Sequence, residues 1–411
     1  MSVPAERLRV LHIGKFYAPQ RGGIERHVQD LAEWQLANGI DVQVLVHQPP
    51  GQWFGTRDLV DGVTVERTGC VAAPLYAPIS PGFPLRLSSM IRRHQPQALH
   101  LHLPNPSCFA LLASPAARRL PWIVHWHADI SADAKDWRLQ VAYRLYRPFE
   151  QAVLRRGAAI IVTSQAYRDA SLALAPWLDK SHVVGLGLAP LTAASPADAS
   201  GSLEVTSDAN AAIAEWPDGE GLKLLAVGRL SYYKGFDTLL DALALLRDRR
   251  DVPMPRLLLV GEGEHGRRLR EHASGLKLDD RVRFAGGVDD DSLQAAYSHA
   301  DLFALPSLDR SEAFGLVLLE AMRAGLPVVA SAIAGSGVGH VVADGVTGDL
   351  FTAGDAVALA DALARMTREP ARRERMGTAG FARWRDEFSL ERSAWGVREV
   401  YDSVLSYEDR I

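Results

Sequence analysis

The feature that most constrains the fold is an alternation of short apolar runs with helical stretches, which occurs twice along the chain. The first series has five runs, at 8–14, 41–48, 98–103, 122–128 and 158–164. The second series has five more, at 222–230, 255–261, 281–287, 302–307 and 327–332. Apolar runs of this length indicate buried strands, and strands that alternate with helices form a mostly parallel sheet with helices on both faces. The sequence therefore predicts an α/β protein with two Rossmann-like, doubly wound domains.

The periodicity fails between the two series, and this gap sets the predicted domain boundaries. Residues 187–221 are rich in Ala, Ser, Pro and Asp and are typical of a linker with a surface insertion. A first domain over 1–186 and a second over 222–389 lie on either side. The segment 390–405 has the spacing of one amphipathic helix. A length of 411 residues agrees with two domains, because a single core rarely grows so large.

Composition excludes several classes of protein. The chain is 47% hydrophobic and 23% charged, which is ordinary for a globular protein and unlike a disordered one. No window approaches the ~18 uninterrupted apolar residues of a membrane span. Glu6, Arg7 and Arg9 stand where a signal peptide needs its apolar core, so we expect the start of a folded domain, with a reducing cytoplasm as the default compartment. Cys70 and Cys108 lie in unrelated contexts and are too few for a zinc site.

The net charge of −4 hides a difference between the two halves of the chain. Residues 1–186 hold 20 basic and 14 acidic residues, a formal charge of +6, whereas the remainder holds 25 and 35, which is −10. A basic first half suits an acidic partner, such as anionic lipid or phosphate. Nucleic acid is not expected as a partner, since the arginines are not interleaved with aromatic residues on a strand platform.

Ligands of open α/β sheets bind outside the carboxyl ends of the strands, so the predicted active site lies in a cleft between two facing domains. One strand-end motif, Gly261-Glu-Gly263-Glu-His-Gly266, has the GxGxxG spacing of dinucleotide-binding folds. Its acidic residues would repel a pyrophosphate, and Asp279 and Asp280 fit a turn better than a ribose-binding acid. We interpret the motif as a strand-to-helix turn whose backbone at Gly261 and Gly263 contacts a base or ribose. An NAD-dependent oxidoreductase is the alternative.

An acidic motif follows the fourth strand of the second series. Glu312 lies in the loop before a helix expected to begin after Phe314 and to end at Gly325, and Glu320 lies within it, about two turns later. The free backbone amides at 314–316 favour an anion. A carboxylate accepts hydrogen bonds from vicinal hydroxyls, so Glu312 suits a sugar and Glu320 suits a ribose. The alternatives are a helix-dipole partner at Glu312 and a solvated helix residue at Glu320.

Two loops that precede helices offer groups for a phosphate. Arg229 and Lys234 follow the first strand of the second domain, and two fixed cations are what a departing diphosphate needs when no metal neutralises it. In the first domain, Gly22 and Gly23 let the backbone approach a phosphate or sugar. An ordinary basic loop and an ordinary glycine turn are the alternatives.

A pair of histidines ends the fourth strand of the first domain. His125 and His127 share one face of the strand by alternation. We interpret His125, deeper in the strand, as a core residue and His127 as a residue that hydrogen-bonds a substrate hydroxyl. A metal site is not expected, because the neighbouring chain supplies no third ligand beyond Asp129. The run 289–291 has Asp-x-Asp spacing but precedes a helical stretch, so we interpret it as an N-cap.

Taken together, these residues resemble family 4 of the glycosyltransferases, which are retaining enzymes with the two-domain GT-B fold. The resemblance covers nearly the whole chain. Its most specific part runs from Arg310 to Met322 and carries the family's Glu-x7-Glu signature. The opening HIGKFYAP and the later GSGVGHVVADGVTG are similar to the mannosyl- and rhamnosyltransferase subset. The fold of the family implies that the final segment, 390–411, packs back on the first domain.

The resemblance implies a role for each matching residue. The catalytic residues are expected to be His127, Glu312, Arg229 and Lys234. The substrate-binding residues are expected to be Gly22, Gly23, Asp129, Gly261, Gly263, Ala313, Phe314, Gly315, Leu316 and Glu320. In these roles, His127 and Glu312 contact the transferred sugar. Arg229 and Lys234 hold the diphosphate, and Glu320 binds the nucleotide ribose.

The resemblance implies a retaining hexosyltransferase that moves a sugar, expected to be mannose from GDP-mannose, to a cell-surface glycan such as lipopolysaccharide or to a lipid-linked acceptor. Family members retain configuration by front-face attack, in which the leaving phosphate helps to deprotonate the acceptor. They generally need no metal, so neither a metal nor a cofactor is expected. Three alternatives stay open: a family 4 enzyme that uses a UDP-sugar or another nucleotide-sugar, a GT-B epimerase or hydrolase, and the NAD-dependent oxidoreductase.

One basic segment offers a contact with the membrane that carries such acceptors. Residues 136–156 mix Trp137, Tyr143, Tyr146 and Phe149 with five arginines. A surface helix of this composition would place the first domain on anionic headgroups, so we expect a peripheral contact with the inner face of the cytoplasmic membrane. A helix packed on the sheet, with its arginines in solvent, is the alternative.

Overall fold

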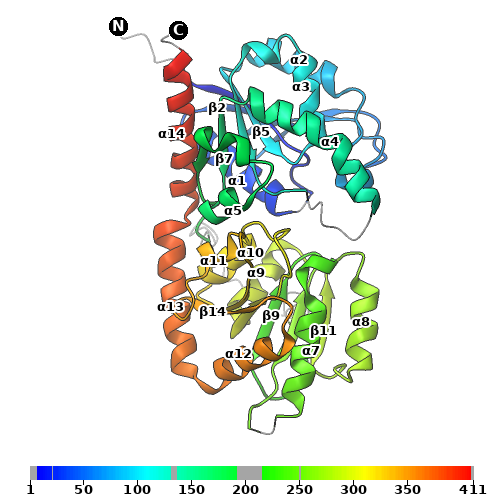
Figure 1. Ribbon diagram of the computed structural model, residues 1–411, viewed down its shortest axis with the longest axis vertical. Helices are drawn as coiled ribbons and strands as arrows, with labels where there is room; N and C mark the ends of the chain where they lie inside the picture. Colours follow the sequence, from blue (N-terminus) through cyan, green and yellow to red (C-terminus); the bar gives the residue numbers. More distant parts are fainter. Residues whose placement is uncertain (1–6, 21, 131–136, 192–214, 250, 409–411) are drawn as a thin grey trace, which may run out of the picture. The chain divides into compact units, whose positions relative to one another are not determined.

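The structure is a computed structural model that describes residues 7–20, 22–130, 137–191, 215–249 and 251–408 (Figure 1). The chain divides into two compact units. Unit 1 comprises Met1–Ala189 and Leu390–Ile411, and unit 2 comprises Pro190–Ser389. Residues 192–214, which make up most of the expected linker and insertion, lie outside the described residues, as do Glu6 and residue 136. Each unit holds one sheet with helices, and the predicted α/β class with two such domains is confirmed.

The sheet of unit 1 has the strand order β3-β4-β2-β1-β5-β6-β7-β8. Its strands are β1 (Arg9–Ile13), β2 (Asp41–His47), β3 (Thr56–Val60), β4 (Val63–Thr68), β5 (Ala98–Leu103), β6 (Trp122–Trp126), β7 (Ala159–Val162) and β8 (Ser181–Val183). Neighbouring strands are parallel except for the β3–β4 hairpin. β5, β6 and β7 are buried at every position, which is what helices on both faces of a parallel sheet produce.

The helices of unit 1 come from both ends of the chain. They are α1 (Gly23–Ala37), α2 (Phe83–His94), α3 (Ala110–Ala113), α4 (Trp137–Arg156), α5 (Gln165–Ala170) and α14 (Leu390–Glu408), with short turns η1 (Pro74–Tyr76), η2 (Pro106–Phe109), η3 (Ala117–Arg119) and η4 (Ala175–Lys180). α14 is the amphipathic helix expected at 390–405. It packs against α1 and β7 (Figure 1), and Val397, Val400 and Tyr401 belong to the same buried cluster as Leu31 and Ile161. Helix α14 is therefore part of the core of unit 1.

Unit 2 has an entirely parallel sheet with the order β11-β10-β9-β12-β13-β14. Its strands are β9 (Lys223–Val227), β10 (Arg256–Val260), β11 (Val282–Gly286), β12 (Leu302–Leu305), β13 (Val328–Ala332) and β14 (Gly348–Thr352). Its helices are η6 (Tyr232–Lys234), α7 (Phe236–Arg247), α8 (Gly266–Gly275), α9 (Asp290–His299), α10 (Leu316–Arg323), α11 (Val338–Val341), α12 (Ala356–Arg368) and α13 (Pro370–Glu387). The strand order reverses at β9, so the loops after β9 and β12 meet at the place where such sheets bind ligands.

The helices of both units were compared with membrane spans by their length and mean hydropathy. Among the described helices, none is both long enough and apolar enough to cross a bilayer.

Candidate active site

The loops after β9 and β12 meet in a buried ion pair. Lys234 ends the turn η6, and Glu312 lies between β12 and α10. Lys234 Nζ donates to Glu312 Oε2 at 2.6 Å, and Ser307 Oγ donates to the same oxygen at 2.8 Å. Lys234 and Glu312 are each only 7% exposed. Buried charges are found in proteins when they are paired and hydrogen-bonded, and both charges of this pair meet that condition.

The electrostatics of this pair keep Lys234 charged. Burial by itself lowers the pKa of Lys234, but the adjacent Glu312 carboxylate and Tyr233 together outweigh that effect, and the pKa is raised. Arg229 lies in the same loop, is exposed, and acts on the pKa of Lys234 in the lowering direction, as a nearby like charge does. The structure thus brings Arg229, Lys234 and Glu312, all predicted site residues, to one corner of unit 2.

The glycines of the GxGxxG motif are explained by close packing against the loop that carries Arg229. A Cβ atom on Gly261 would lie 2.0 Å from the carbonyl oxygen of Gly228, and one on Gly263 would lie 2.4 Å from that of Leu230. The Leu230 amide donates to the Glu262 carbonyl at 2.9 Å. The motif is a strand-to-helix turn, as interpreted from the sequence, and it fixes the position of Arg229. Contact of Gly261 and Gly263 with a base or ribose stays a prediction.

The loop before α10 is held by its neighbours. Ala313 and Phe314 are buried, and the Gly337 amide donates to the Ala313 carbonyl at 2.7 Å. Gly315 caps α10 with φ 84°, a conformation that glycine adopts without strain, and Leu316 begins the helix. The helix expected after Phe314 is therefore present. Its first-turn amides follow Glu312 within a few residues along the chain.

Glu320 lies in α10, half-buried, and is tied to a neighbouring helix. Tyr297 of α9 donates from its hydroxyl to Glu320 Oε2 at 2.8 Å. Burial and the Glu320 carboxylate raise the pKa of Tyr297 well above its usual range, so this hydroxyl keeps its hydrogen. The role of Glu320 toward a ribose stays a prediction. At the other end of α9, Asp289 accepts from the Ser292 amide at 2.8 Å, which confirms the N-cap expected at 289–291.

In unit 1, the predicted residues fall at two places. Gly22 precedes α1 in an extended conformation and Gly23 is its first residue; both are exposed. The Glu25 carboxylate lies so close that a Cβ on Gly22 would stand 2.2 Å from its Oε2. Asp129 follows β6 and is engaged within the unit, because its Oδ1 accepts from Trp126 Nε1 at 2.9 Å and from Ser171 Oγ at 2.6 Å.

The two histidines of β6 and its end belong to a larger cluster that the sequence reasoning missed. His125 and His127 are buried, and His127 Nε2 lies 3.0 Å from His102 Nδ1 of β5. One ring nitrogen from each of His102, His125 and His127 lies within 4.8 Å of the others. The sequence reasoning considered a third ligand only in the neighbouring chain and missed His102, which parallel pairing places beside His125. The signal was the repeated His-x-His of the two strands, at 100–102 and 125–127.

The fold and the two family models that match define the class of protein. The structure superposes on sucrose-phosphate synthase from Thermosynechococcus elongatus with a TM-score of 0.74, covering 98% of this chain and 100% of that one at 23% identity. The two proteins therefore share the GT-B fold. Residues 22–187 match the model described as a glycosyl transferase 4-like domain, and residues 211–383 match that of the glycosyl transferases group 1. The protein is a glycosyltransferase.

Relatives narrow the class to a family. The chain is 31% identical to the phosphatidyl-myo-inositol mannosyltransferase of Mycobacterium leprae, over 95% of each chain. It is also 31% identical to the D-rhamnosyltransferase WbpZ of Pseudomonas aeruginosa, over 93% of this chain and 92% of that one. The chain belongs to family 4 of the glycosyltransferases. The predicted resemblance to the mannosyl- and rhamnosyltransferase subset is confirmed, and the oxidoreductase and epimerase alternatives are set aside.

Proposed function

We propose that this protein transfers mannose from GDP-mannose, with retention of configuration, to a cell-surface glycan or a lipid-linked acceptor. The observation that carries the proposal is the buried Lys234–Glu312 pair beside Arg229, at the carboxyl ends of β9 and β12. The choice of mannose is supported by the mannosyltransferase and rhamnosyltransferase relatives. A UDP-sugar or another nucleotide-sugar is the alternative donor.

The proposed chemistry uses the cations of this corner for the leaving group. Lys234 Nζ has three hydrogens and one described hydrogen bond, to Glu312, so two donors remain for a diphosphate. With Arg229, they stabilise the negative charge that grows as the sugar–phosphate bond breaks. The acceptor oxygen then bonds to the same face of the anomeric carbon, and its proton passes to the leaving phosphate oxygen. In this proposal no metal is required, since the two side chains supply the positive charge.

A panel of nucleotide-sugars tests the donor. Thermal unfolding is followed with GDP-mannose and with UDP-, ADP- and dTDP-sugars, all in the presence of EDTA. A ligand at a hundred times its Kd adds about 2.7 kcal/mol of stability, and we expect GDP-mannose to give the largest shift. A shift confined to another nucleotide would refute GDP-mannose as the donor. No shift with any of them would remove the proposed site.

We also propose that α4 contacts anionic membrane. Val141, Leu145 and Phe149 are exposed and spaced four residues apart, so they form one apolar stripe on the helix. Arg144 and Arg147 beside the stripe are also exposed. Tyr146 and one face of Phe149 pack against Phe109, with ring centroids at 4.7 Å and 5.4 Å, which holds the helix to the unit. An exposed apolar stripe flanked by arginines is typical of helices that lie in the headgroup layer.

Vesicle sedimentation tests this contact. The protein should pellet with phosphatidylglycerol-containing vesicles at low salt and not with neutral phosphatidylcholine vesicles. Leu145→Glu should reduce the bound fraction strongly, since it places a charge in the stripe. The matched control is Leu172→Glu, because Leu172 is 84% exposed elsewhere in unit 1. Equal losses in both variants, or no binding by the wild type, would contradict the proposal.

A further inference from the structure

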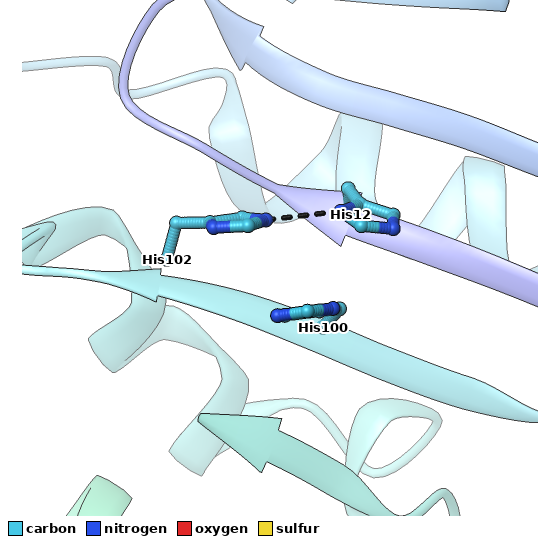
Figure 2. Close-up of side chains that lie close together, drawn as sticks. All are labelled: His12, His100 and His102. Carbon is cyan, nitrogen blue, oxygen red and sulfur yellow. Dashed lines mark hydrogen bonds between the residues drawn. The ribbon is translucent and has the colours of Figure 1, made fainter. Parts of the chain in front are cut away.

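Six histidines gather in the interior of unit 1, and among them only His127 has a role implied by the resemblance to family 4 glycosyltransferases. They are His12, His27, His100, His102, His125 and His127, and all are at most 5% exposed. They come from β1, α1, β5 and β6 and from the loop that follows β6. Figure 2 shows three of them, with the rings of His12 and His102 joined by a hydrogen bond and His100 beneath. A cluster of this size in a dry core requires an account of every ring nitrogen.

Four residues form a continuous hydrogen-bonded row, which we call the first tape. Gln35 Oε1 lies 2.8 Å from His12 Nε2, and His12 Nδ1 lies 2.9 Å from His102 Nε2. The last link joins His102 Nδ1 to His127 Nε2 at 3.0 Å, so the row ends at His127.

A second tape starts from the other atom of the same amide. Gln35 Nε2 donates to the Tyr401 hydroxyl oxygen at 3.0 Å, and that hydroxyl lies 2.5 Å from His100 Nδ1. His100 Nε2 then lies 3.2 Å from His125 Nδ1. Gln35 is thus the common origin of both tapes.

Gln35 determines which nitrogen of each ring carries the hydrogen. Its Oε1 can only accept, so His12 must donate from Nε2, and a neutral imidazole then has only a lone pair at Nδ1. The same step repeats at His102 and at His127, which is left with a lone pair on Nδ1. Along the second tape, Tyr401 receives the amide hydrogen and so donates its own to His100. His125 therefore ends with a hydrogen on Nε2. The opposite amide orientation would reverse both tapes together.

The rings are neutral at physiological pH, as this reasoning requires. Burial lowers the pKa of His12 to about 4 and that of His27 to about 3. Burial, and then the neighbouring rings, hold the pKa of His100 and His125 well below their usual value.

The ends of the two tapes complement one hydroxyl group. Within the part of the chain that the structure describes, His127 Nδ1 and His125 Nε2 are buried and have no hydrogen-bond partner. Their rings stack at 4.3 Å and 11°, so a ring with a free acceptor lies against a ring with a free donor. His27 lies edge-on to both rings, at 4.8 Å from His125 and 5.5 Å from His127, and its two nitrogens also have no described partner. One hydroxyl that donates to His127 Nδ1 and accepts from His125 Nε2 would satisfy the two tape ends, whereas empty space leaves each of them at a cost of about 1–3 kcal/mol.

A metal ion fits this geometry poorly. A coordinated ion needs a free lone pair on each ring that binds it, but both ring nitrogens of His12, His100 and His102 are engaged in hydrogen bonds. His125 Nε2 also carries a hydrogen in the polarity that Gln35 sets, and metal ligation needs a lone pair there.

We propose that the ends of the two tapes form a binding site for one hydroxyl group, and that Gln35 is the positioning residue that sets the polarity of this site through Tyr401 and the histidines. The hydroxyl is supplied either by an ordered water or by a sugar. Only the sugar source rests on the proposed function.

Nitrogen NMR on the full chain with ¹⁵N-labelled histidine tests the polarity without any transfer assay. Long-range ¹H–¹⁵N correlations distinguish a protonated ring nitrogen from one with a lone pair, and His125→Asn and His127→Asn assign the signals. We expect five rings, His12, His100, His102, His125 and His127, each in the Nε2–H form alone. A mixture of forms at His127, or a proton on His127 Nδ1 while His125 keeps its Nε2–H form, would overturn the proposal.

Substitution of Gln35, the common origin of both tapes, tests whether this residue sets the tautomers of the histidines. Gln35→Met keeps the side-chain length and removes both bonds, so His102 and His127 should populate both tautomers. Gln29→Met, on the same helix and bonded outside the cluster to Glu33, should leave them unchanged. Unaltered signals of His47, which bonds Lys15 and Ser107, report an intact unit 1. A single Nε2–H form that survives Gln35→Met would refute the role of Gln35.

Two additions identify the occupant. Magnetisation transfer from a long-lived water to the His125 Nε2–H proton indicates water, and its replacement by transfer from added GDP-mannose indicates a sugar hydroxyl. The absence of both signals would overturn the proposed hydroxyl site. Saturable 1:1 broadening of the His102, His125 and His127 signals by Co²⁺ would also overturn it, in favour of a metal site. If the wild-type protein gave the expected histidine NMR signals but transferred no mannose from GDP-mannose, that result would count against the proposed function and not against the hydroxyl site.

Discussion

Lys234→Met should lower kcat for sugar transfer about 10³-fold, because it removes the buried cation proposed to stabilise the departing diphosphate. The substitution also leaves the buried Glu312 carboxylate with Ser307 as its remaining described hydrogen-bond partner, and breaking a buried pair costs about 3–5 kcal/mol. Activity is measured as nucleotide release at saturating donor, and stability by urea unfolding. Exposed Lys277 of unit 2 provides the matched control, since Lys277→Met should change neither quantity.

A second variant separates the chemistry from the fold. Lys234→Met combined with Glu312→Gln removes both charges, so no unpaired ion remains in the interior, and most of the lost stability should return. Transfer should stay about 10³-fold low, because the diphosphate has lost its buried cation. If the double variant regained stability and turned over within tenfold of the wild type, the role assigned to Lys234 would be wrong.

Acidification from pH 7 to pH 5 should cost unit 1 several kcal/mol of unfolding free energy. The six clustered histidines have folded pKa values below the usual 6.5, at about 4 for His12 and about 3 for His27. The unfolded chain therefore binds more protons below pH 6.5, and stability falls as the pH drops toward the folded values. Each such histidine contributes up to about 1.4 kcal/mol per pH unit within that window, and nothing above it.

His27→Phe isolates one member of the cluster. The ring keeps its shape, two buried nitrogens without a described partner disappear, and one titrating group is lost. Urea unfolding at pH 7, 6 and 5 should show a slope reduced by about 1.4 kcal/mol per pH unit and no loss of stability at pH 7. The control is His272→Phe, because His272 is paired with Asp241 in unit 2 and partly exposed. An unchanged slope for His27→Phe would contradict the account of the cluster.

Local patterns were enough to predict the parallel sheets, because strands covered on both faces are continuous apolar runs. The hairpin of β3 and β4 was missed. Its turn has the Asp61-Gly62 pair that favours a two-residue hairpin, with both residues at positive φ. β3 is largely exposed, however, and in β4 Glu66 is buried with Arg86 and Arg93 as partners. Polar residues that find partners far along the chain conceal a strand from any reading of hydropathy.

The site was predicted where spacing along the chain carried the signal, as in the segment from Glu312 to Glu320. What escaped was the pairing of side chains distant in sequence. Lys234 and Glu312 stand 78 residues apart. Tyr401 reaches His100 from the far end of the chain, because α14 packs into unit 1. Such contacts depend on strand order and on which helix covers which face, and neither is written in a local motif.

The most direct test of the central claim is the stereochemical course of the reaction without metal. The protein is incubated with GDP-mannose and a set of mannoside and phosphatidylinositol acceptors in EDTA, and the product is analysed by NMR. We predict release of GDP and a new mannosidic bond of the same anomeric configuration as the donor. An inverted product, or complete loss of transfer on addition of EDTA, would contradict the account.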